Sequence, residues 1–293
     1  MLLLLLTLIP AKAASPWTLP EGATSVYAGV GVSTFATGMS GFSRDRYLQS
    51  RLALWAGRGL GERTQLSLSL PLVHTRVLED PDEGPCPSGD YCKPSTSLGS
   101  VEVAVQHRIS GGGVPFAVRL GLFGDPWNAP TRGRWTNAGQ GTFGGVVDAI
   151  TGTSAGEDTR WATAAVLGLA VPVPQRATSA SGDVRWLPAP TLRATVEGSV
   201  QHGIIQATVA LHGHQRLYGE PYGPDWVRDW RPVLDRWRVT RWGEVRPELK
   251  LSVLHPGGRS GVHLAASRSV LVAAGPPDLW DVGLGVHVYL PGD

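Results

Sequence analysis

Residues 64–73, TQLSLSLPLV, alternate apolar and small polar side chains over the length of a β-strand. Successive side chains of an extended chain point to opposite faces, so four leucines share one face and the polar residues share the other. The apolar face of such a strand must rest either on the core of a soluble protein or on lipid. What the leucines contact therefore decides the fold class and limits the function.

The same alternation recurs along the chain and predicts about 12 strands. Clear examples lie at 26–32, 48–54, 101–109, 116–122, 192–197, 205–212, 244–254 and 280–290, whereas Gly and Ala obscure the two faces at 140–152 and 159–172. Short connections at 57–63, 111–113, 153–158, 201–203 and 255–259 alternate with longer ones at 37–45, 78–98, 124–139, 173–188, 218–241 and 272–278. Short turns at one end and long loops at the other are typical of outer-membrane barrels. We therefore predict an all-β fold, a closed antiparallel transmembrane β-barrel with up-and-down meander connectivity.

The N-terminus and the composition agree with an exported barrel. Residues 1–14, MLLLLLTLIPAKAA, have the apolar stretch and the small-x-small Ala11-Lys12-Ala13 of a signal peptide. We therefore expect residues 15–293 to form the barrel in the outer membrane of a Gram-negative bacterium, with outer-membrane lipid as its partner. The charged fraction is 17%, and the mean hydropathy of −0.03 argues against a bundle of membrane-spanning helices. A net charge of +2 provides no argument for a nucleic-acid partner.

Two cysteines lie in the acidic, Pro- and Gly-rich segment EDPDEGPCPSGDYCKP. After export, Cys86 and Cys92 are expected to form a local disulfide. The alternatives are a metal-binding pair, which lacks a nearby histidine, and two free thiols.

The polar faces of the expected strands carry charges of both signs. A ring of one sign would predict ion selectivity, whereas a mixture favours ion pairs between neighbouring strands inside a narrow lumen. In the soluble alternative, a periplasmic β-protein, the same faces would meet solvent. The candidate lumen-lining residues are Arg51, Glu102, Arg108, Arg119, Arg193, Glu197, Glu244, Arg246, Glu248, Lys250 and Asp281. Three tryptophans near strand ends, Trp55, Trp161 and Trp280, are candidates for aromatic girdles at the membrane interfaces.

Residues 225–242, DWVRDWRPVLDRWRVTRW, interleave tryptophans with arginines. Such interleaving occurs in proteins that bind single-stranded nucleic acid, but the aspartates of this segment and export argue against that partner. We expect an external loop that folds over the barrel mouth or lies against lipid headgroups, whose phosphates arginine pairs with. A purely structural loop is the alternative. The residues concerned are Trp226, Trp230, Trp237, Arg228 and Arg231.

Three further features resemble catalytic or metal-binding motifs. Residues 152–156, GTSAG, match a nucleophile elbow, but that motif needs a following helix and a strand-like stretch follows here. His212 and His214 share a strand face, and a metal site would need at least one more ligand. His107 is expected on the lipid side, and no serine segment like that of an outer-membrane phospholipase accompanies it. We therefore expect no catalytic residue, no metal and no cofactor.

Three segments resemble stretches of the outer-membrane barrels grouped as phenol-degradation-pathway transporters. They are Trp17-Thr-Leu-Pro-Glu-Gly22, Gly59-Leu-Gly-Glu-Arg63 and Leu98-Gly-Ser-Val101. The resemblance implies a roughly 12-stranded barrel with a transport role and no catalytic residues. Ser100 stands where the family often has an acid, and the cysteine-bearing segment and residues 124–128 also depart from the family's pattern, so no substrate follows from it.

Together these observations predict a channel or uptake protein that passes small molecules through a polar, mixed-charge lumen. The alternative is a non-conducting structural or surface-interaction barrel that presents its external loops. Neither the solute nor the oligomeric state is indicated by the sequence.

Overall fold

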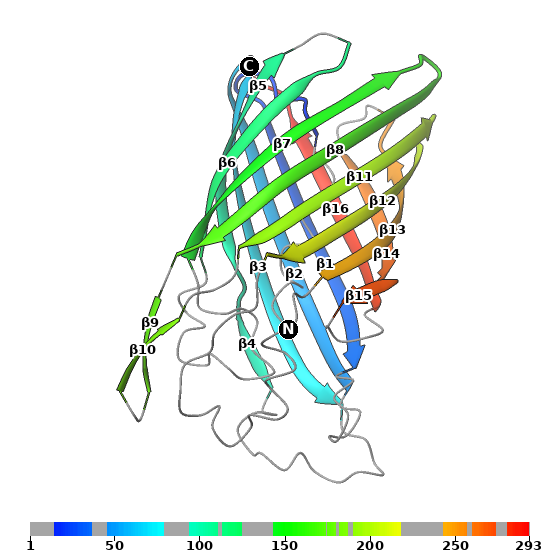
Figure 1. The fold of residues 1–293 in the computed structure, drawn as a ribbon. Helices are drawn as coiled ribbons and strands as arrows, with labels where there is room; N and C mark the ends of the chain where they lie inside the picture. The colour runs from blue at the N-terminus through cyan, green and yellow to red at the C-terminus, as the bar shows by residue number, and fades with distance from the viewer. Residues whose placement is uncertain are drawn as a thin grey trace.

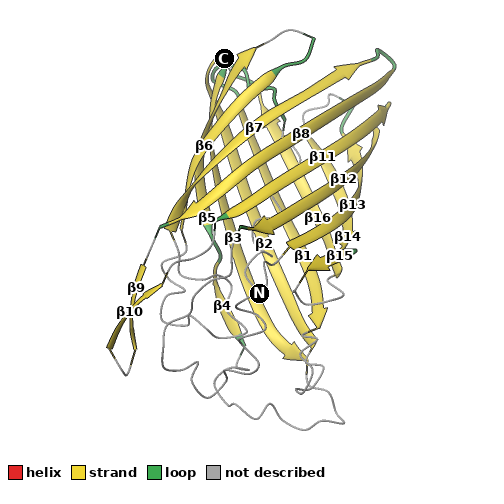
Figure 2. Ribbon diagram, viewed as in Figure 1, coloured by secondary structure: helices red, strands yellow, loops and turns green. Residues whose placement is uncertain are grey.

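The computed structural model describes residues 15–36, 46–78, 94–110, 113–124, 143–173, 175–179, 182–186, 190–217, 243–256, 260–273 and 280–292. Strands and turns make up these residues, as Figure 2 shows. No helix among them is long and apolar enough to cross a membrane. Several predictions lie outside the described residues: the signal peptide, the Cys86–Cys92 disulfide and the external-loop residues Trp226, Trp230, Trp237, Arg228 and Arg231.

Figure 1 shows the strands, whose bounds are as follows. They are β1 (Thr24–Ala36), β2 (Arg46–Gly61), β3 (Thr64–Leu78), β4 (Ser95–Leu98), β5 (Val101–Ser110), β6 (Phe116–Gly124), β7 (Phe143–Ala155), β8 (Thr159–Pro172), β9 (Gln175–Ser179), β10 (Gly182–Trp186), β11 (Thr191–His202), β12 (Ile205–Arg216), β13 (Gly243–Leu254), β14 (Ser260–Arg268), β15 (Leu271–Ala273) and β16 (Trp280–Leu290).

The strands close into a barrel. The main sheet contains 14 strands, but β4 continues β5 along β3, and β15 continues β14 along β13, so twelve strands make up the wall. Each strand runs antiparallel to its neighbours, and β1 pairs with β16 from Thr24↔Leu290 to Thr34↔Trp280. The remaining hairpin, β9–β10, stands apart from the wall in the connection between β8 and β11. The predicted closed antiparallel meander of about 12 strands is thus confirmed.

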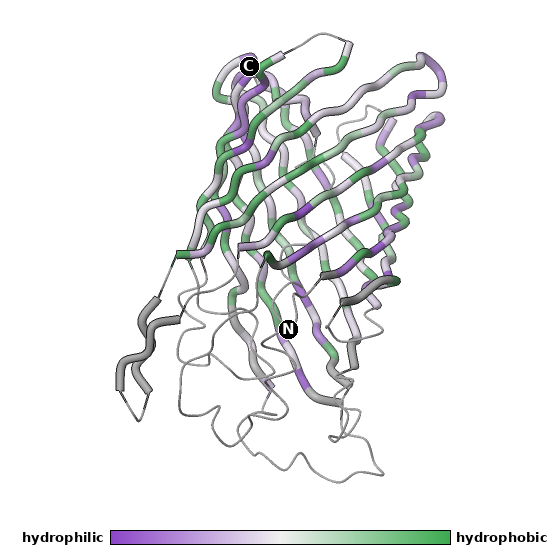
Figure 3. The backbone as a smooth tube through the Cα atoms, viewed as in Figure 1, coloured by the Kyte–Doolittle hydropathy of each residue, from purple (hydrophilic) through white to green (hydrophobic). Residues whose placement is uncertain are grey.

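The two faces of the wall are reversed relative to a soluble β-protein. Charged side chains face inward and are buried, whereas every strand of the wall exposes large aliphatic side chains outward. One outward residue from each strand illustrates this: Val30, Leu52, Leu68, Val103, Leu120, Val147, Leu167, Val196, Val209, Leu249, Leu264 and Leu284. Figure 3 shows the resulting alternation of hydropathy along the strands. A closed wall with an apolar exterior is the arrangement that a bilayer requires, because lipid cannot pair exposed backbone groups.

The structure corrects one prediction about the tryptophans. Trp161 and Trp280 are exposed on the outer surface, but Trp55 is only 4% exposed and faces inward. The reason is the alternation itself, because Trp55 lies an even number of residues after the inward-facing Arg51 on β2. Trp55 therefore belongs to the interior and not to an aromatic girdle.

The structure also resolves the region that the sequence left ambiguous. On β7 the side chains of Val146, Asp148 and Ile150 are buried in the interior. β7 ends at Ala155, and Gly156, with φ of 98°, lies in the turn that leads into β8. A strand and not a helix follows, so residues 152–156 lack the geometry of a nucleophile elbow; the expected turn begins only at Gly156, because residues 152–155 still belong to β7.

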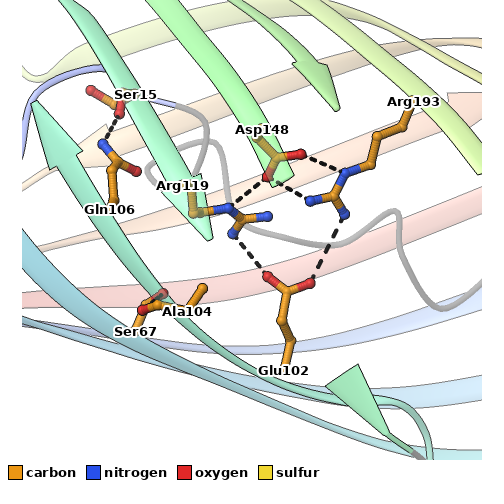
Figure 4. Close-up of polar contacts among 8 residues, drawn as sticks. All are labelled: Ser15, Ser67, Glu102, Ala104, Gln106, Arg119, Asp148 and Arg193. Carbon is orange, nitrogen blue, oxygen red and sulfur yellow. Dashed lines mark hydrogen bonds and ion pairs between the residues drawn. The ribbon is translucent and has the colours of Figure 1, made fainter. Parts of the chain in front are cut away.

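Residues 15–22, which we call the N-terminal strap, lie across the short-turn end of the barrel. The amide of Gly22 donates to the Gly59 carbonyl at 3.0 Å, and the Leu19 amide donates to Oε1 of the buried Gln65 at 3.0 Å. Further inside, Nε2 of Gln106 donates to the Ser15 carbonyl at 2.8 Å (Figure 4). The strap is therefore held both at the rim and within the interior.

Candidate functional site: ion networks and a chamber in the barrel interior

Ten of the eleven candidate lumen-lining residues lie in the interior of the barrel. Seven of them are at most 7% exposed, and Arg246, at 1%, is among the most completely buried of the described side chains. Arg108 is the exception, because it lies at the short-turn rim, where its Nη2 donates to the Glu62 carbonyl at 3.1 Å. The structure gathers eight of the ten interior residues into three clusters, whereas Glu197 and Lys250 line a chamber described below.

The first cluster is a four-residue network that joins β5, β6, β7 and β11 (Figure 4). Arg119 donates from Nε to Oδ2 of Asp148 at 2.7 Å, and its Nη1 lies 3.0 Å from Oε1 of Glu102. Arg193 donates from Nε and Nη2 to the two carboxylate oxygens of Asp148, at 2.9 and 2.6 Å. Its Nη1 lies 3.9 Å from Oε2 of Glu102, which closes the ring. Two guanidinium groups thus neutralise two buried carboxylates, with the bidentate geometry that makes such pairs strong.

Asp148 is the member of this network that sequence reasoning missed. The Gly- and Ala-rich composition of residues 140–172 hid which side chains face inward. One signal was present, because Asp148 is the only charged residue in the whole of β7. An isolated carboxylate in an otherwise apolar strand needs a partner, and in a barrel that partner has to lie across the interior face.

A glycine makes the network possible. The register places Arg119, Asp148, Gly168 and Arg193 in one row across β6, β7, β8 and β11. A Cβ atom at Gly168 would overlap Oδ1 of Asp148 and lie 2.9 Å from Nε of Arg193. Because Gly168 on β8 has no side chain, Asp148 on β7 and Arg193 on β11 can contact each other across β8.

The second cluster lies on β2, β13 and β16. Nη2 of Arg51 donates to Oδ2 of Asp281 at 2.6 Å, and this ion pair spans the intervening strand β1. On β13, Glu244 accepts a hydrogen bond from the Ser269 hydroxyl. Arg246 lies between the acids of β13, and within the part of the chain that the structure describes its Nε and Nη1 have no hydrogen-bond partner.

The third cluster joins β11, β12 and β13. Nε2 of His212 lies 3.7 Å from Oε2 of Glu248, and Nδ1 of the same ring lies 3.2 Å from the Thr195 hydroxyl. His214 also faces inward and is buried. The two histidines thus share the interior face, and the described residues contain no group of three or more side chains that could hold a metal ion.

A chamber of about 360 Å³ occupies the barrel interior toward the short-turn end. On one side are β14, β16, β1, β2 and the strap, which present five aromatic rings: Trp17, Tyr27, Trp55, His263 and His287. On the other side are β11, β12 and β13, which present polar and charged groups: Glu197, Ser199, Gln201, Gln206, Thr208, Glu248 and Lys250. In the ring of twelve strands, β2 and β11 are diametrically opposed, whereas β14 and β13 are neighbours. The aromatic and the charged walls therefore face one another at β2 and β11 and adjoin at β14 and β13.

The aromatic wall contains a stacked pair of histidines that the sequence gave no reason to connect. The rings of His263 and His287 lie 4.6 Å apart, and Nε2 of His263 is 2.5 Å from Nδ1 of His287. Nδ1 of His263 is 2.6 Å from the Ser252 hydroxyl. The ring of Tyr27 lies 6.2 Å from that of His263. These contacts depend on the pairing of β14 with β13 and β16, which alternation along one strand does not specify.

Comparison with known proteins locates the fold among bacterial outer-membrane barrels. The chain is similar to the crystal structure of the COG4313 outer membrane channel from Pseudomonas putida F1, with a TM-score of 0.68 and 15% identity over 94% of this chain and 97% of that one. Weaker likenesses, both with a TM-score of 0.49, include the β domain of the Bordetella autotransporter BrkA and the NanC porin. The first is 12% identical over 92% of this chain and 100% of its own, and the second 8% identical over 90% and 100%.

By sequence, the chain matches no family model and no curated protein. The resemblance to phenol-degradation-pathway transporters therefore stays a prediction. The structural comparison supports a more general statement about the fold. The chain has the fold of a bacterial outer-membrane β-barrel and resembles a channel of that class.

Proposed function

We propose that the protein is an outer-membrane channel that lets small molecules cross through the interior of its barrel. The observation that carries the proposal is the chamber, because a barrel that served only as a scaffold would gain stability by filling this space with side chains. Its volume of about 360 Å³ falls in the range of small-molecule sites. Its lining combines aromatic and small apolar side chains with polar and charged ones, and the apolar exterior supports contact between the wall and outer-membrane lipid.

The charges suggest weak selectivity by sign. The four-residue network contributes two cations and two anions, and Arg51 is balanced by Asp281. Charge-paired walls favour neither anions nor cations strongly, unlike a ring of one sign. We therefore expect neutral and zwitterionic solutes to pass more readily than either class of ion.

Swelling of proteoliposomes tests the proposal directly. Liposomes that contain the refolded full chain should swell in isotonic arabinose faster than liposomes that contain boiled protein. Single-channel recordings in planar bilayers should show discrete conductance steps. Absence of both signals, from the full chain and from a variant that lacks residues 218–241, would contradict a channel.

That negative outcome would favour the second candidate, a non-conducting barrel that presents its external loops. Two observations favour it: ion pairs join different strands inside the lumen, and the strap lies across the short-turn end. The swelling measurement separates the two candidates, since a structural barrel would fold normally and yet pass no solute.

A further inference from the structure

The chamber contains two charged side chains of opposite sign that are left without a direct partner. Among the described residues, neither Glu197 on β11 nor Lys250 on β13 makes a hydrogen bond or an ion pair. Their charges act on one another, but the two groups do not meet. Both line the chamber, and both are largely withdrawn from solvent.

The contrast with most of the other interior charges is informative, although Arg246 also has two guanidinium nitrogens without a hydrogen-bond partner among the described residues. The carboxylates of Glu102, Asp148 and Asp281 each contact a guanidinium group at 3.0 Å or less. Glu248, which also lines the chamber, has His212 at 3.7 Å. A largely buried charge without a partner costs free energy, and a protein commonly compensates for that cost with an ion pair. Glu197 and Lys250 face the same cavity and yet remain apart.

The register explains why the two groups stay apart. Glu197 pairs with Ala210 on β12, whereas Lys250 pairs with Thr208, two residues further toward the short turns. One strand therefore separates them sideways, and a two-residue step separates them along the barrel. This offset leaves room for a solute's own charged groups between the ammonium and the carboxylate.

We propose that the chamber binds a small zwitterion with an aromatic or other apolar body. The solute's carboxylate contacts Lys250 and its ammonium contacts Glu197, which replaces two unpartnered charges with two charge-assisted contacts. Its apolar body rests on the facing aromatic wall, chiefly Trp55 and Tyr27. Because Glu197 and Lys250 together carry no net charge, a solute without net charge matches this pair of side chains. This inference deepens the proposed channel function by naming a solute class.

Three ligands of similar size test the contacts with Lys250 and with Glu197 one at a time. L-Phenylalanine has both groups, 2-phenylethylamine lacks the carboxylate, and 3-phenylpropanoate lacks the amine. Titration calorimetry of the detergent-solubilised full chain at neutral pH should show L-phenylalanine binding at least about tenfold more tightly than either analogue, since each loses one charge-assisted contact.

Two substitutions should remove these preferences one at a time. Lys250→Met should bring L-phenylalanine and 2-phenylethylamine to equal affinity, because nothing then recognises the carboxylate. Glu197→Gln should do the same for L-phenylalanine and 3-phenylpropanoate. Lys250→Arg retains the cation and should preserve the preference, and Glu157→Gln, at an exposed position in the β7–β8 turn, should leave binding unchanged. A shift in gel migration on boiling verifies that each variant is folded.

The outcomes are distinct. Equal binding of 2-phenylethylamine and L-phenylalanine to the unmodified chain would indicate a simple cation site and would overturn the inference. Equal binding of 3-phenylpropanoate would indicate a simple anion site with the same consequence, and absence of any binding would also overturn it. Arabinose swelling tests the channel separately. Swelling without a preference for the zwitterion would support the channel and contradict the binding site. A preference for the zwitterion without swelling would support the binding site and contradict the channel.

Discussion

At the scale of single residues, the barrel interior depends on charges that are satisfied only in combination. Asp148 accepts one hydrogen bond from Arg119 and two from Arg193, whereas Glu102 makes one contact with each arginine. Removing it would leave two guanidinium groups facing the single carboxylate of Glu102. The cost of such a change comes less from the lost attraction than from the cations left behind without compensation.

Asp148→Asn is therefore expected to lower the free energy of unfolding by about 3 kcal/mol. Urea unfolding of the vesicle-inserted protein, followed by tryptophan fluorescence, measures the change. The matched control is Asp158→Asn, since Asp158 is exposed in the turn between β7 and β8. Equal unfolding midpoints for the two variants would contradict the role given to the network.

Gly168→Ala tests the same network without altering any charge. The added methyl group would overlap Oδ1 of Asp148 and push Asp148 away from Arg193, so we expect a loss of about 1–3 kcal/mol. Gly198→Ala is the control, because a Cβ atom at Gly198 on the adjacent strand β11 meets no other atom within 4 Å. In the same urea experiment, Gly168→Ala combined with Asp148→Asn should cost less than the sum of the two single changes, because both act on one network. Strict additivity would argue against this account.

At the scale of elements, the strap packs tightly against the wall at Gly59 and is also hydrogen-bonded to Gln65 and Gln106. Its Leu19 and Pro20 carbonyls lie directly over Gly59 on β2, at the point where two of the segments that resemble phenol-degradation-pathway transporters meet. Ser15 and Trp17 line the chamber, so the strap forms part of its floor at the short-turn end. Anything that displaces the strap should therefore widen that end of the barrel.

Gly59→Ala is expected to displace the strap, because the new methyl group would overlap the Pro20 carbonyl oxygen. We expect faster arabinose swelling of proteoliposomes and a larger single-channel conductance than for the unmodified chain. Gly61→Ala provides the control two residues away, since a Cβ atom there meets no other atom within 4 Å. If both variants conduct like the unmodified chain, the strap does not limit passage.

At the scale of the whole molecule, the barrel is organised as an inside-out protein with ion pairs within and aliphatic side chains outside. Leu264 and Leu284, paired between β14 and β16, are each at least half exposed near the middle of the wall. A soluble protein would have to cover such a band, whereas hydrocarbon covers it without cost. The outer surface is therefore expected to tolerate charge only near its rims.

Leu284→Arg should lower the free energy of unfolding from vesicles by about 2–4 kcal/mol, because the charge would lie near the membrane midplane. Ile204→Arg is the matched control, since Ile204 is similarly exposed, at 45%, but lies in the β11–β12 turn, where the expected cost is about 0–1 kcal/mol. Equal effects of the two substitutions, measured by urea unfolding in vesicles, would show that no hydrocarbon layer surrounds the middle of the wall.

The sequence by itself determined the class of fold and, for most strands, which side chains share a face. These properties follow from the two-residue period of an extended backbone, which is local and survives in any tertiary context. The alternation in 64–73 put its leucines outside, and the charged face of 244–250 lies inside. The same rule, applied to β2, would have placed Trp55 inside rather than in a girdle.

Only the tertiary structure decided which interior groups meet. Glu102 and Arg193 belong to strands separated by three others, and their contact depends on the tilt and register of a closed barrel together with the bare surface of Gly168. The His263–His287 pair and the separation of Glu197 from Lys250 depend on register in the same way. Register is a relation between strands, and a period read along one strand holds no information about the stagger of its neighbours.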